Sequence, residues 1–358
     1  MQHIYTLINT MKRGEIMKSI VLCGGGTAGH IMPNIALLPE LMKNFDQIYY
    51  IGGANSLEQK IVAKHNIKFY TTDVVKFERH KLFANLKIPF KLLKGINSAK
   101  KILRMLNPSI IFCKGGYASL PTAYAARFMK IPVICHESDM TLGLANKLIS
   151  PFAAATFTTF KATNGRGNLI YTGLPIRENI GVGNKEKLLK ELNLPDRPNI
   201  LVIGGSLGSQ AINNTVFDSA SELLKTYNII HITGKKESNY KSNNYRSVAF
   251  ADNIADYFAL ADVVVSRAGA TACAELSYLK KKMLLIPLPK GTSRGDQVLN
   301  AKAYEAAGAA KVLLQKDLSK DSLIMSIKAL MTSPSPHSEI KTASNVEIVN
   351  LIAKYSRK

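Results

Sequence analysis

The sequence predicts an α/β protein with two doubly wound parallel-sheet domains, and two observations lead to this class. Short apolar runs alternate with longer helical patterns along the chain, which is the rhythm of strand–helix–strand units. Two glycine-rich turns of the same kind, Gly24–His30 and Gly204–Ser209, each directly follow one of these runs. The repeated turn indicates that one nucleotide-binding half is followed by another.

The first half contains six expected strands, each a run of aliphatic, β-branched or aromatic residues. They are Ser19–Cys23, Gln47–Ile51, Ile67–Tyr70, Ser109–Cys113, Pro132–Cys135 and Ala154–Phe157. Residues 1–16 precede the first strand, and we expect them to be an extension from an upstream start codon. They are excluded from the fold.

A polar, glycine-bearing stretch at Lys161–Gly167 interrupts this rhythm, which then restarts. The second set of expected strands is Asn199–Ile203, Ile229–Ile232, Ser247–Phe250, Val263–Val265, Met283–Pro287 and Lys311–Leu313. A boundary is therefore expected near 165–195, which divides the chain into domains 17–175 and 176–358. Apolar residues at three-residue intervals predict a last helix within Ser338–Tyr355, which we expect to cross back to the first domain.

Composition and charge limit the classes of function that the chain can have. The 358 residues are 46% apolar, and 47 Lys and Arg against 25 Asp and Glu give a formal charge of +22. This charge favours an anionic partner: nucleic acid, an acidic membrane face or a phosphorylated substrate. No run approaches the roughly 18 apolar residues of a membrane span, and the first residues lack a signal-peptide core, which predicts a cytoplasmic protein. Four cysteines without CxxC spacing are expected to be buried thiols.

The first glycine turn formally matches the dinucleotide fingerprint through Gly24, Gly26 and Gly29. A redox role is disfavoured because the second strand is followed by no acid before Glu58, whereas the fingerprint needs one to hold a ribose hydroxyl. His30, at the junction of loop and helix, is instead a candidate general base. The alternative for His30 is a helix-start residue that is bonded locally.

In the second half, Ser266–Thr271 leads into a helix with Glu275, and Gly291–Gln297 leads into one with Asn300. Both follow strands, so their polar groups are expected to converge with Gly204–Ser209 at one sheet edge. Glu275 could accept both ribose hydroxyls of a nucleotide, and its alternative is a solvated helix acid.

No His/Cys cluster has metal-ligand spacing, and no Asp-x-Asp occurs, so a diphosphate would be held by helix termini and side chains such as Arg177. We therefore expect metal-independent transfer with no cofactor. The absence of Gly-x-Ser-x-Gly and GxxxxGK[ST] patterns removes the common hydrolase and phosphate-loop classes.

Residues 76–104 carry nine Lys and Arg and one acid, interleaved with large apolar side chains. This pattern is typical of a segment that lies at an anionic membrane surface. The alternative is a helix that packs its apolar side on the sheet and solvates its lysines. Nucleic-acid binding is disfavoured because no RNA or DNA motif accompanies the segment.

Seven motifs in order resemble the MurG glycosyltransferases, from Met17 onward. They are GGGTAGHIMPNIAL (24–37), KGGYASLP (114–121), HESDMTLGLANK (136–147), GLPIRE (173–178), GGSLGSQAIN (204–213), SRAGATACAEL (266–276) and SRGDQVLNA (293–301). The resemblance implies a GT-B glycosyltransferase architecture, with two Rossmann-like domains facing across a cleft. It also implies inverting transfer of GlcNAc from UDP-GlcNAc to the 4-hydroxyl of lipid I, which forms lipid II for peptidoglycan and serves cell shape and division.

The resemblance further implies roles for individual residues. Binding of UDP-GlcNAc is carried over to Thr27, Gly29, Arg177, Ser206, Gly208, Ala270, Glu275, Asp296, Gln297 and Asn300. Binding of the acceptor is carried over to Gly26, Ala28, Gly115, Gly116, Tyr117 and Glu137. Contact with the anionic inner leaflet, as a peripheral protein on the cytoplasmic side of the cell membrane, is expected of Phe77, Lys81, Leu82, Phe83, Leu86, Lys87, Phe90 and Lys91.

Two departures from the family leave the general base open. Many relatives have Gln-Asn where this chain has Ser138-Asp139, and Gln-Gln where it has Asp296-Gln297. Either His30 or Asp139 could therefore take the proton from the acceptor hydroxyl.

Other functions stay open at this point. They are a GT-B enzyme with a different lipid acceptor, or a basic membrane-surface or nucleic-acid-binding protein. Other cell-wall synthesis proteins are further expected partners.

Overall fold

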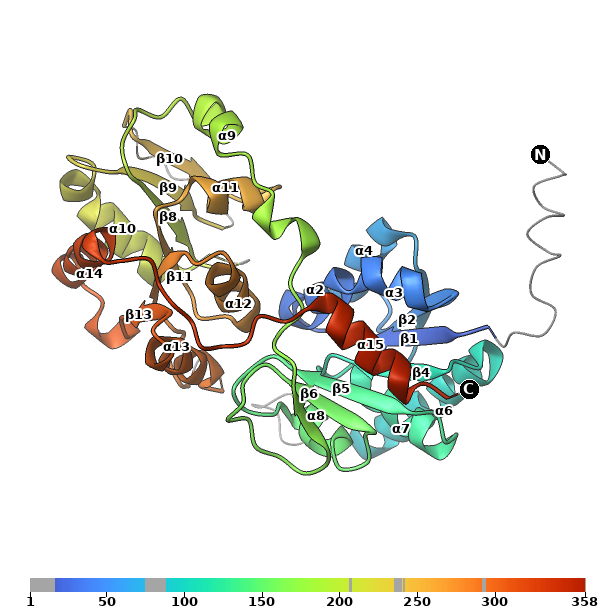
Figure 1. Cartoon of the computed structure of the whole chain (residues 1–358). Coiled ribbons are helices and arrows are strands. Elements are labelled where there is room, and N and C mark those ends of the chain that lie inside the picture. Colours follow the sequence, from blue (N-terminus) through green and yellow to red (C-terminus); the bar gives the residue numbers. More distant parts are fainter. Residues whose placement is uncertain are drawn as a thin grey trace, which may run out of the picture.

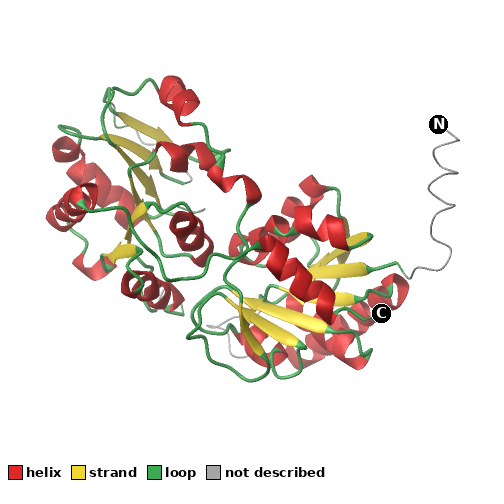
Figure 2. Cartoon of the chain, in the orientation of Figure 1, coloured by secondary structure: helices red, strands yellow, loops and turns green. Residues whose placement is uncertain are grey.

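A computed structural model describes residues 17–74, 88–205, 208–234, 240, 242–291 and 294–357. The chain forms two lobes, each with a parallel sheet whose strands are flanked by helices (Figures 1 and 2). The expected leader 1–16 lies outside the described residues.

The first sheet has seven parallel strands in the order β3-β2-β1-β4-β5-β6-β7. Their bounds are β1 Ser19–Cys23, β2 Gln47–Gly52, β3 Lys68–Thr71, β4 Ile110–Cys113, β5 Val133–Glu137, β6 Ala155–Thr158 and β7 Leu169–Tyr171. The six expected strands are confirmed. The seventh, β7, was not expected, because its run of three half-buried apolar residues is shorter than the runs of the expected strands in this half.

Helices cover both faces of this sheet, as a doubly wound fold requires. They are α2 Ala28–Ala36, α3 Leu38–Asn44, α4 Leu57–Val62, the 3-10 turn η1 Ala63–His65, α6 Ile88–Leu106, α7 Ser119–Phe128 and α8 Leu144–Ile149. The two core clusters contain alternate residues of the same strands: Leu22 and Phe112 lie in one, Val21 and Ile111 in the other.

The second sheet repeats the strand order of the first, as β10-β9-β8-β11-β12-β13. Its strands are β8 Asn199–Ile203, β9 Asn228–Ile232, β10 Tyr245–Val248, β11 Val263–Ser266, β12 Lys282–Leu285 and β13 Ala310–Val312. The expected strand Ser247–Phe250 lies two residues too late. Tyr245 is buried and bonds to His231 through its hydroxyl, whereas Phe250 is 68% exposed.

The helical segments of the second lobe begin after the connection from β7. They are η2 Glu178–Gly181, α9 Lys185–Leu192, α10 Gln210–Leu223, α11 Ile254–Leu260, α12 Ala270–Tyr278, α13 Asp296–Ala306, η3 Gln315–Asp317 and α14 Lys320–Thr332.

The final helix, α15 Asn345–Tyr355, packs on the first lobe against α3 and β4 (Figure 1). Ile348, Val349 and Ile352 are fully buried in the core cluster that contains Leu22. The helix begins later than expected because the Ser344 side chain caps it by accepting the Glu347 N–H.

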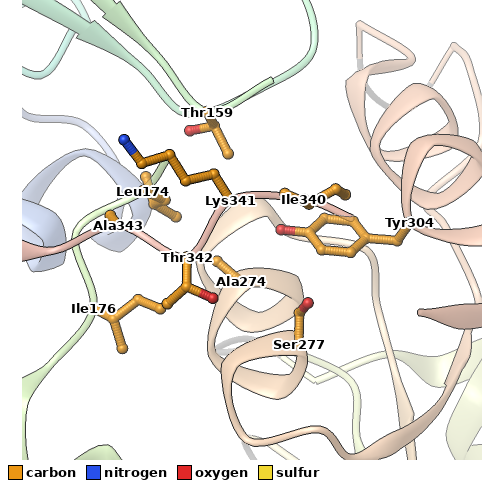
Figure 3. Close-up of a pocket in the computed structure, with 10 residues that line it drawn as sticks. All are labelled: Thr159, Leu174, Ile176, Ala274, Ser277, Tyr304, Ile340, Lys341, Thr342 and Ala343. Carbon is orange, nitrogen blue, oxygen red and sulfur yellow. The ribbon is translucent and has the colours of Figure 1, made fainter. Parts of the chain in front are cut away.

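Residues 340–343 run between the lobes and line a cavity of about 10 Å³, room for a single water (Figure 3). There the Lys341 backbone N–H donates to the Tyr171 hydroxyl at 2.6 Å. This crossing ties the end of the chain to the first lobe.

Within the described part of the chain, no helix is long and apolar enough to cross a membrane. All four cysteines are buried free thiols, as expected.

Candidate active site

The first glycine loop is held rigidly by side chains from β2 and α4. The Tyr50 hydroxyl donates to the Gly24 carbonyl at 2.6 Å, and the Gly26 N–H donates to Glu58 Oε2 at 3.3 Å. Gly26 has a φ of 89°, and a Cβ there would lie 2.7 Å from the Tyr117 ring. Only glycine allows this backbone and this contact.

A further glycine pair after β4, Gly115-Gly116, forms what we call the second glycine loop. It packs directly on the first. Gly115 and Gly116 have φ angles of 87° and 76°, and a Cβ on Gly116 would lie 2.2 Å from the Gly25 carbonyl oxygen. Gly26, Gly116 and Tyr117, three of the six residues expected to bind the acceptor, therefore lie at one contact between loops, and Gly115 directly precedes Gly116. Ala28 lies at the start of α2.

His30 lies on the first turn of α2, beside both loops. Its Nδ1 is 3.0 Å from the Gly25 carbonyl oxygen and 3.2 Å from Thr27 Oγ1. A neutral ring that donates from Nδ1 to the carbonyl presents Nε2 as its acceptor. Burial, followed by the Lys114 charge, lowers the pKa of His30. His30 can therefore keep its hydrogen bond to Gly25 through Nδ1 and still offer Nε2 as a base.

Glu137, the remaining residue of the expected acceptor set, is buried at the end of β5 and organises the next loop. Its carboxylate accepts the N–H groups of Asp139 and Gly143 at 3.1 and 2.7 Å, and the Asn146 amide at 2.9 Å. These bonds fix residues 138–143 in place ahead of α8.

Loop 138–143 meets the start of α13 across the two lobes. Asn300 donates to Asp139 Oδ1 at 2.9 Å and accepts the Met140 N–H at 2.9 Å, while Thr141 donates to Asp296 Oδ1 at 2.8 Å. Arg294 pairs with Asp296 at 2.7 Å and with Asp139 at 3.4 Å. Residues expected to serve the donor and the base are therefore bonded to each other in this structure.

Burial raises the pKa of Asp139, and the Asn300 amide opposes that shift.

Arg177 and Glu275 form a two-point ion pair between the segment after β7 and helix α12. Nε and Nη2 of Arg177 lie 2.7 and 2.8 Å from the two carboxylate oxygens. The Glu275 side chain is only 4% exposed and that of Arg177 is 35% exposed. Glu275 is therefore not the solvated acid of the alternative interpretation.

The third glycine loop, between β8 and α10, contains Gly205 and Gly208 with φ angles of 92° and 74°. The Arg267 guanidinium lies next to this loop and donates to Ser209 Oγ at 2.7 Å. The Ser209 side chain caps α10, so a cation and a helix N-terminus lie together. Ser206 lies outside the described residues.

The other residues expected to bind the donor are distributed over both lobes. Ala270 begins α12, and Gln297 accepts the Leu288 N–H at 3.0 Å. Thr27 and Gly29 lie exposed at the start of α2 on the first lobe. Helices α2 and α12 are in contact, so the two lobes meet beside this site.

Family models match both lobes: the glycosyltransferase family 28 N-terminal domain over residues 20–158 and its C-terminal domain over residues 199–355. The UDP-N-acetylglucosamine–N-acetylmuramyl-(pentapeptide) pyrophosphoryl-undecaprenol N-acetylglucosamine transferase of Clostridium perfringens is 43% identical over 321 residues, covering 87% of this chain and 89% of the relative. The protein of the same name from Clostridium novyi is 40% identical, covering 94% and 99%.

The chain belongs to the MurG family of glycosyltransferases.

Solved structures agree with this membership. The crystal structure of Acinetobacter baumannii MurG is 25% identical with a TM-score of 0.74, covering 94% of this chain and 99% of that one. The glycotransferase of kitacinnamycin, at 14% identity and a TM-score of 0.73, shares the fold over 96% of this chain and 100% of its own. The expected GT-B architecture of this MurG-family chain is therefore confirmed.

Two features of the site escaped the sequence analysis. Arg294, which pairs with both Asp139 and Asp296, belongs to the SRGDQVLNA motif, but no role was predicted for it. Lys114 bonds to His136 and Ser138 beneath the glycine loops. The sequence does contain a signal for the Lys114 cluster, because polar residues directly follow the apolar runs that end at Cys113 and Cys135.

The segment expected to touch the membrane is described only in part. Phe77, Lys81, Leu82, Phe83, Leu86 and Lys87 lie outside the described residues. Phe90 and Lys91, on the first turn of α6, are exposed, and Leu93 joins them at 59% exposure. Further along the same helix, Ile96, Ala99 and Leu103 are buried against the sheet. The described helix thus has both a packed face and an exposed apolar end.

Proposed function

We propose that this chain transfers GlcNAc from UDP-GlcNAc to the 4-hydroxyl of lipid I, forming lipid II with inversion at the anomeric carbon. The observation that carries the proposal is the bonded contact between loop 138–143 and the start of α13. It brings the acceptor-side loops of one sheet against the donor-side loops of the other. The likeness to relatives named for this transfer, over most of both chains, supports the choice of substrates.

Charge near the third glycine loop supports a diphosphate there. The N-terminus of α10 presents backbone N–H groups and a partial positive charge, and Arg267 lies behind it. Helix N-termini and arginines can stabilise a diphosphate leaving group without a metal ion. Within the described residues, no group of His, Cys, Asp and Glu could hold a metal ion. We therefore propose metal-independent transfer.

His30 is the base we assign to the acceptor hydroxyl. Burial keeps its imidazole neutral, and a neutral imidazole with Nδ1 bonded to Gly25 can accept a proton at Nε2. Asp139 instead has one carboxylate oxygen bonded to Asn300 and the other facing Arg294. We assign it to the contact between the lobes. In the transfer, the hydroxyl oxygen bonds to C1 of GlcNAc, its proton passes to His30, and the C1–oxygen bond breaks toward UDP.

Peripheral binding to the anionic inner leaflet completes the proposal. Phe90 and Leu93 offer exposed apolar area, and Lys91 supplies adjacent positive charge. Apolar insertion combined with basic neighbours favours an anionic membrane surface.

The test measures UDP release from UDP-GlcNAc with a lipid I analogue in EDTA, for wild type, His30→Ala, Asp139→Asn and Glu275→Ala. We expect acceptor-dependent turnover that survives EDTA, fails in Glu275→Ala, and falls more in His30→Ala than in Asp139→Asn. Turnover with another lipid acceptor but not with the lipid I analogue would refute the acceptor. A larger loss in Asp139→Asn than in His30→Ala would transfer the role of base to Asp139.

A further inference from the structure

Glu58 is a fully buried acid that takes no part in the transfer steps proposed above. It is the first acid after β2 and lies on the first turn of α4, where Ser56 caps the helix by accepting the Gln59 N–H at 3.2 Å. Helix α4 contacts α2, the helix that carries His30. A buried carboxylate is costly for folding unless it is well bonded, so its surroundings show what it does.

The glycines around Glu58 bring its carboxylate against the backbone of the first glycine loop. A Cβ on Gly25 would lie 2.5 Å from Glu58 Oε1, and a Cβ on Gly52 would lie 2.9 Å from Glu58 Cγ. Non-bonded heavy atoms pack best at about 3.5–4.0 Å, so a larger residue at either position would push the carboxylate away. The approach therefore depends on glycine at both places.

Both carboxylate oxygens of Glu58 accept backbone N–H groups. Oε2 accepts the Gly26 N–H at 3.3 Å, and Oε1 accepts the Gly53 N–H at 3.2 Å. Hydrogen bonds to an ionised acceptor are stronger than those between neutral groups. Glu58 thus ties the first glycine loop to the loop that follows β2.

The bond to Gly26 also reaches His30, because the Gly26 N–H and the Gly25 carbonyl belong to one planar peptide unit. The N–H end of this unit donates to Glu58, and its carbonyl end accepts from His30 Nδ1 at 3.0 Å. In a rigid plane, a bond that fixes one end also fixes the direction of the other. A carboxylate on the N–H end further polarises the peptide, which makes its carbonyl a stronger acceptor.

The Nδ1 edge of His30 is enclosed by the two glycine loops. Nδ1 lies 3.2 Å from Thr27 Oγ1, and a Cβ on Gly116 would lie 3.1 Å from it. Since the Gly25 carbonyl can only accept, Nδ1 carries the proton of the neutral ring, and Nε2 is the nitrogen that can take another. The direction of the Gly25 carbonyl therefore decides which nitrogen of His30 is basic.

We propose that Glu58 is a positioning residue for the transfer reaction: through the Gly25–Gly26 peptide it keeps the proton of neutral His30 on Nδ1, so that Nε2 can accept the proton of the acceptor hydroxyl. This inference rests on the proposed function, because that function assigns His30 as the base. In the Ser-His-Asp triad a carboxylate sets the histidine tautomer by direct contact. Here the carboxylate acts from one peptide unit away.

The first test observes the tautomer itself. Glu58→Gln keeps the size of the side chain, but its amide has only one accepting oxygen, so its N–H2 end must face the N–H of either Gly26 or Gly53. NMR of the full chain labelled with 15N-histidine, at about pH 8 where histidine is neutral, distinguishes Nδ1–H from Nε2–H rings. His30→Gln identifies the His30 signals among the seven histidines. We expect the Nδ1–H form in wild type and a substantial Nε2–H fraction in Glu58→Gln.

The second test measures kcat and KM with UDP-GlcNAc and the lipid I analogue. In Glu58→Gln we expect kcat to fall about 10- to 100-fold, because a misdirected base loses its alignment with the hydroxyl. The KM for UDP-GlcNAc should stay within about twofold of wild type, because Glu275 and α12 lie on the other lobe.

The matched control is Glu40→Gln. Glu40 also lies on the first turn of a helix of the first lobe, α3, but it pairs with Lys43 at 2.6 Å. This variant should keep the wild-type spectrum and kcat.

The outcomes separate the two proposals. A wild-type His30 with its proton on Nε2 overturns the role of Glu58, whether or not the variant folds. So does an unchanged tautomer in Glu58→Gln, even with a lower Tm and a lower kcat, because Glu58 would then serve folding alone. No transfer to the lipid I analogue by the wild type contradicts the proposed function, whereas the spectra still report on the link between Glu58 and His30.

Discussion

The ion pair between Glu275 and Arg177 provides a quantitative test of the donor site. Glu275→Gln keeps the size of the side chain but replaces one accepting oxygen with an N–H2 group. That group then faces a guanidinium that has only donors, so one of the two bonds at 2.7 and 2.8 Å becomes a repulsive contact. The change therefore removes a charge from a site that is nearly closed to water.

The expected magnitude follows from the kind of bond that is lost. If Glu275 accepts the ribose hydroxyls of UDP, the bonds to its carboxylate are charge-assisted, and removing the charge costs about 1.5–3 kcal/mol. At about 1.4 kcal/mol for each factor of ten, this corresponds to a KM for UDP-GlcNAc raised about 10- to 150-fold. The KM for the lipid acceptor should change far less, because α12 belongs to the second lobe.

The assay varies UDP-GlcNAc at a fixed, saturating concentration of lipid I analogue, alongside thermal unfolding of each variant. Glu222→Gln is the control, because Glu222 also pairs with cations, Lys225 and Lys328, but on the exposed surface. Its KM should stay within about twofold of wild type. A Glu275→Gln enzyme with an unchanged donor KM and only a lower Tm would refute the reasoning, since the ion pair would then serve folding alone.

Three further predictions follow. Burial lowers the pKa of His231 to about 4, and because the folded pKa lies below the unfolded value near 6.5, its contribution is complete above about pH 6.5 and is lost as pH falls toward 4. Urea unfolding of wild type should therefore lose about 3 kcal/mol more between pH 7 and pH 4 than unfolding of His231→Gln. Ile352→Ala, which empties a fully buried position where α15 packs on the first lobe, should lower the free energy of unfolding by about 2–5 kcal/mol, and an unchanged urea midpoint would contradict that packing. Phe90→Ser should reduce cosedimentation with anionic phosphatidylglycerol vesicles, whereas Phe250→Ser, 68% exposed on the second lobe, should leave it unchanged; equal binding of both variants would disfavour α6 as the membrane contact.

Periodicity predicts most of the fold because it reports a local property. Strands such as β1 and β8 are buried on both faces, so they appear as uninterrupted apolar runs bounded by glycine turns. Elements with a weak periodic signal are missed or misplaced. β7 is three half-buried residues long, and α15 begins late because a serine cap, invisible to hydrophobic spacing, sets its start.

The sequence predicts which residues belong to the candidate site, but not which of their side chains contact each other. Spacing and resemblance predict roles for Arg177 and Glu275, yet their ion pair joins positions 98 residues apart. The bond between Lys114 and Ser138 likewise depends on β4 and β5 lying side by side, which a local pattern does not encode. Side-chain geometry between elements therefore has to come from the structure.

The two departures from the family pattern are linked by one arginine. The resemblance predicts an amide in place of both Asp139 and Asp296, and the two residues belong to opposite lobes. Burial raises the pKa of Asp139, and the negative charges of Glu137 and Asp296 add to that shift. Arg294 compensates by pairing with both, at 3.4 and 2.7 Å. The acids thus form one charged contact across the lobes. We expect a donor sugar that enters beside α13 to compete with the bonds that hold loop 138–143.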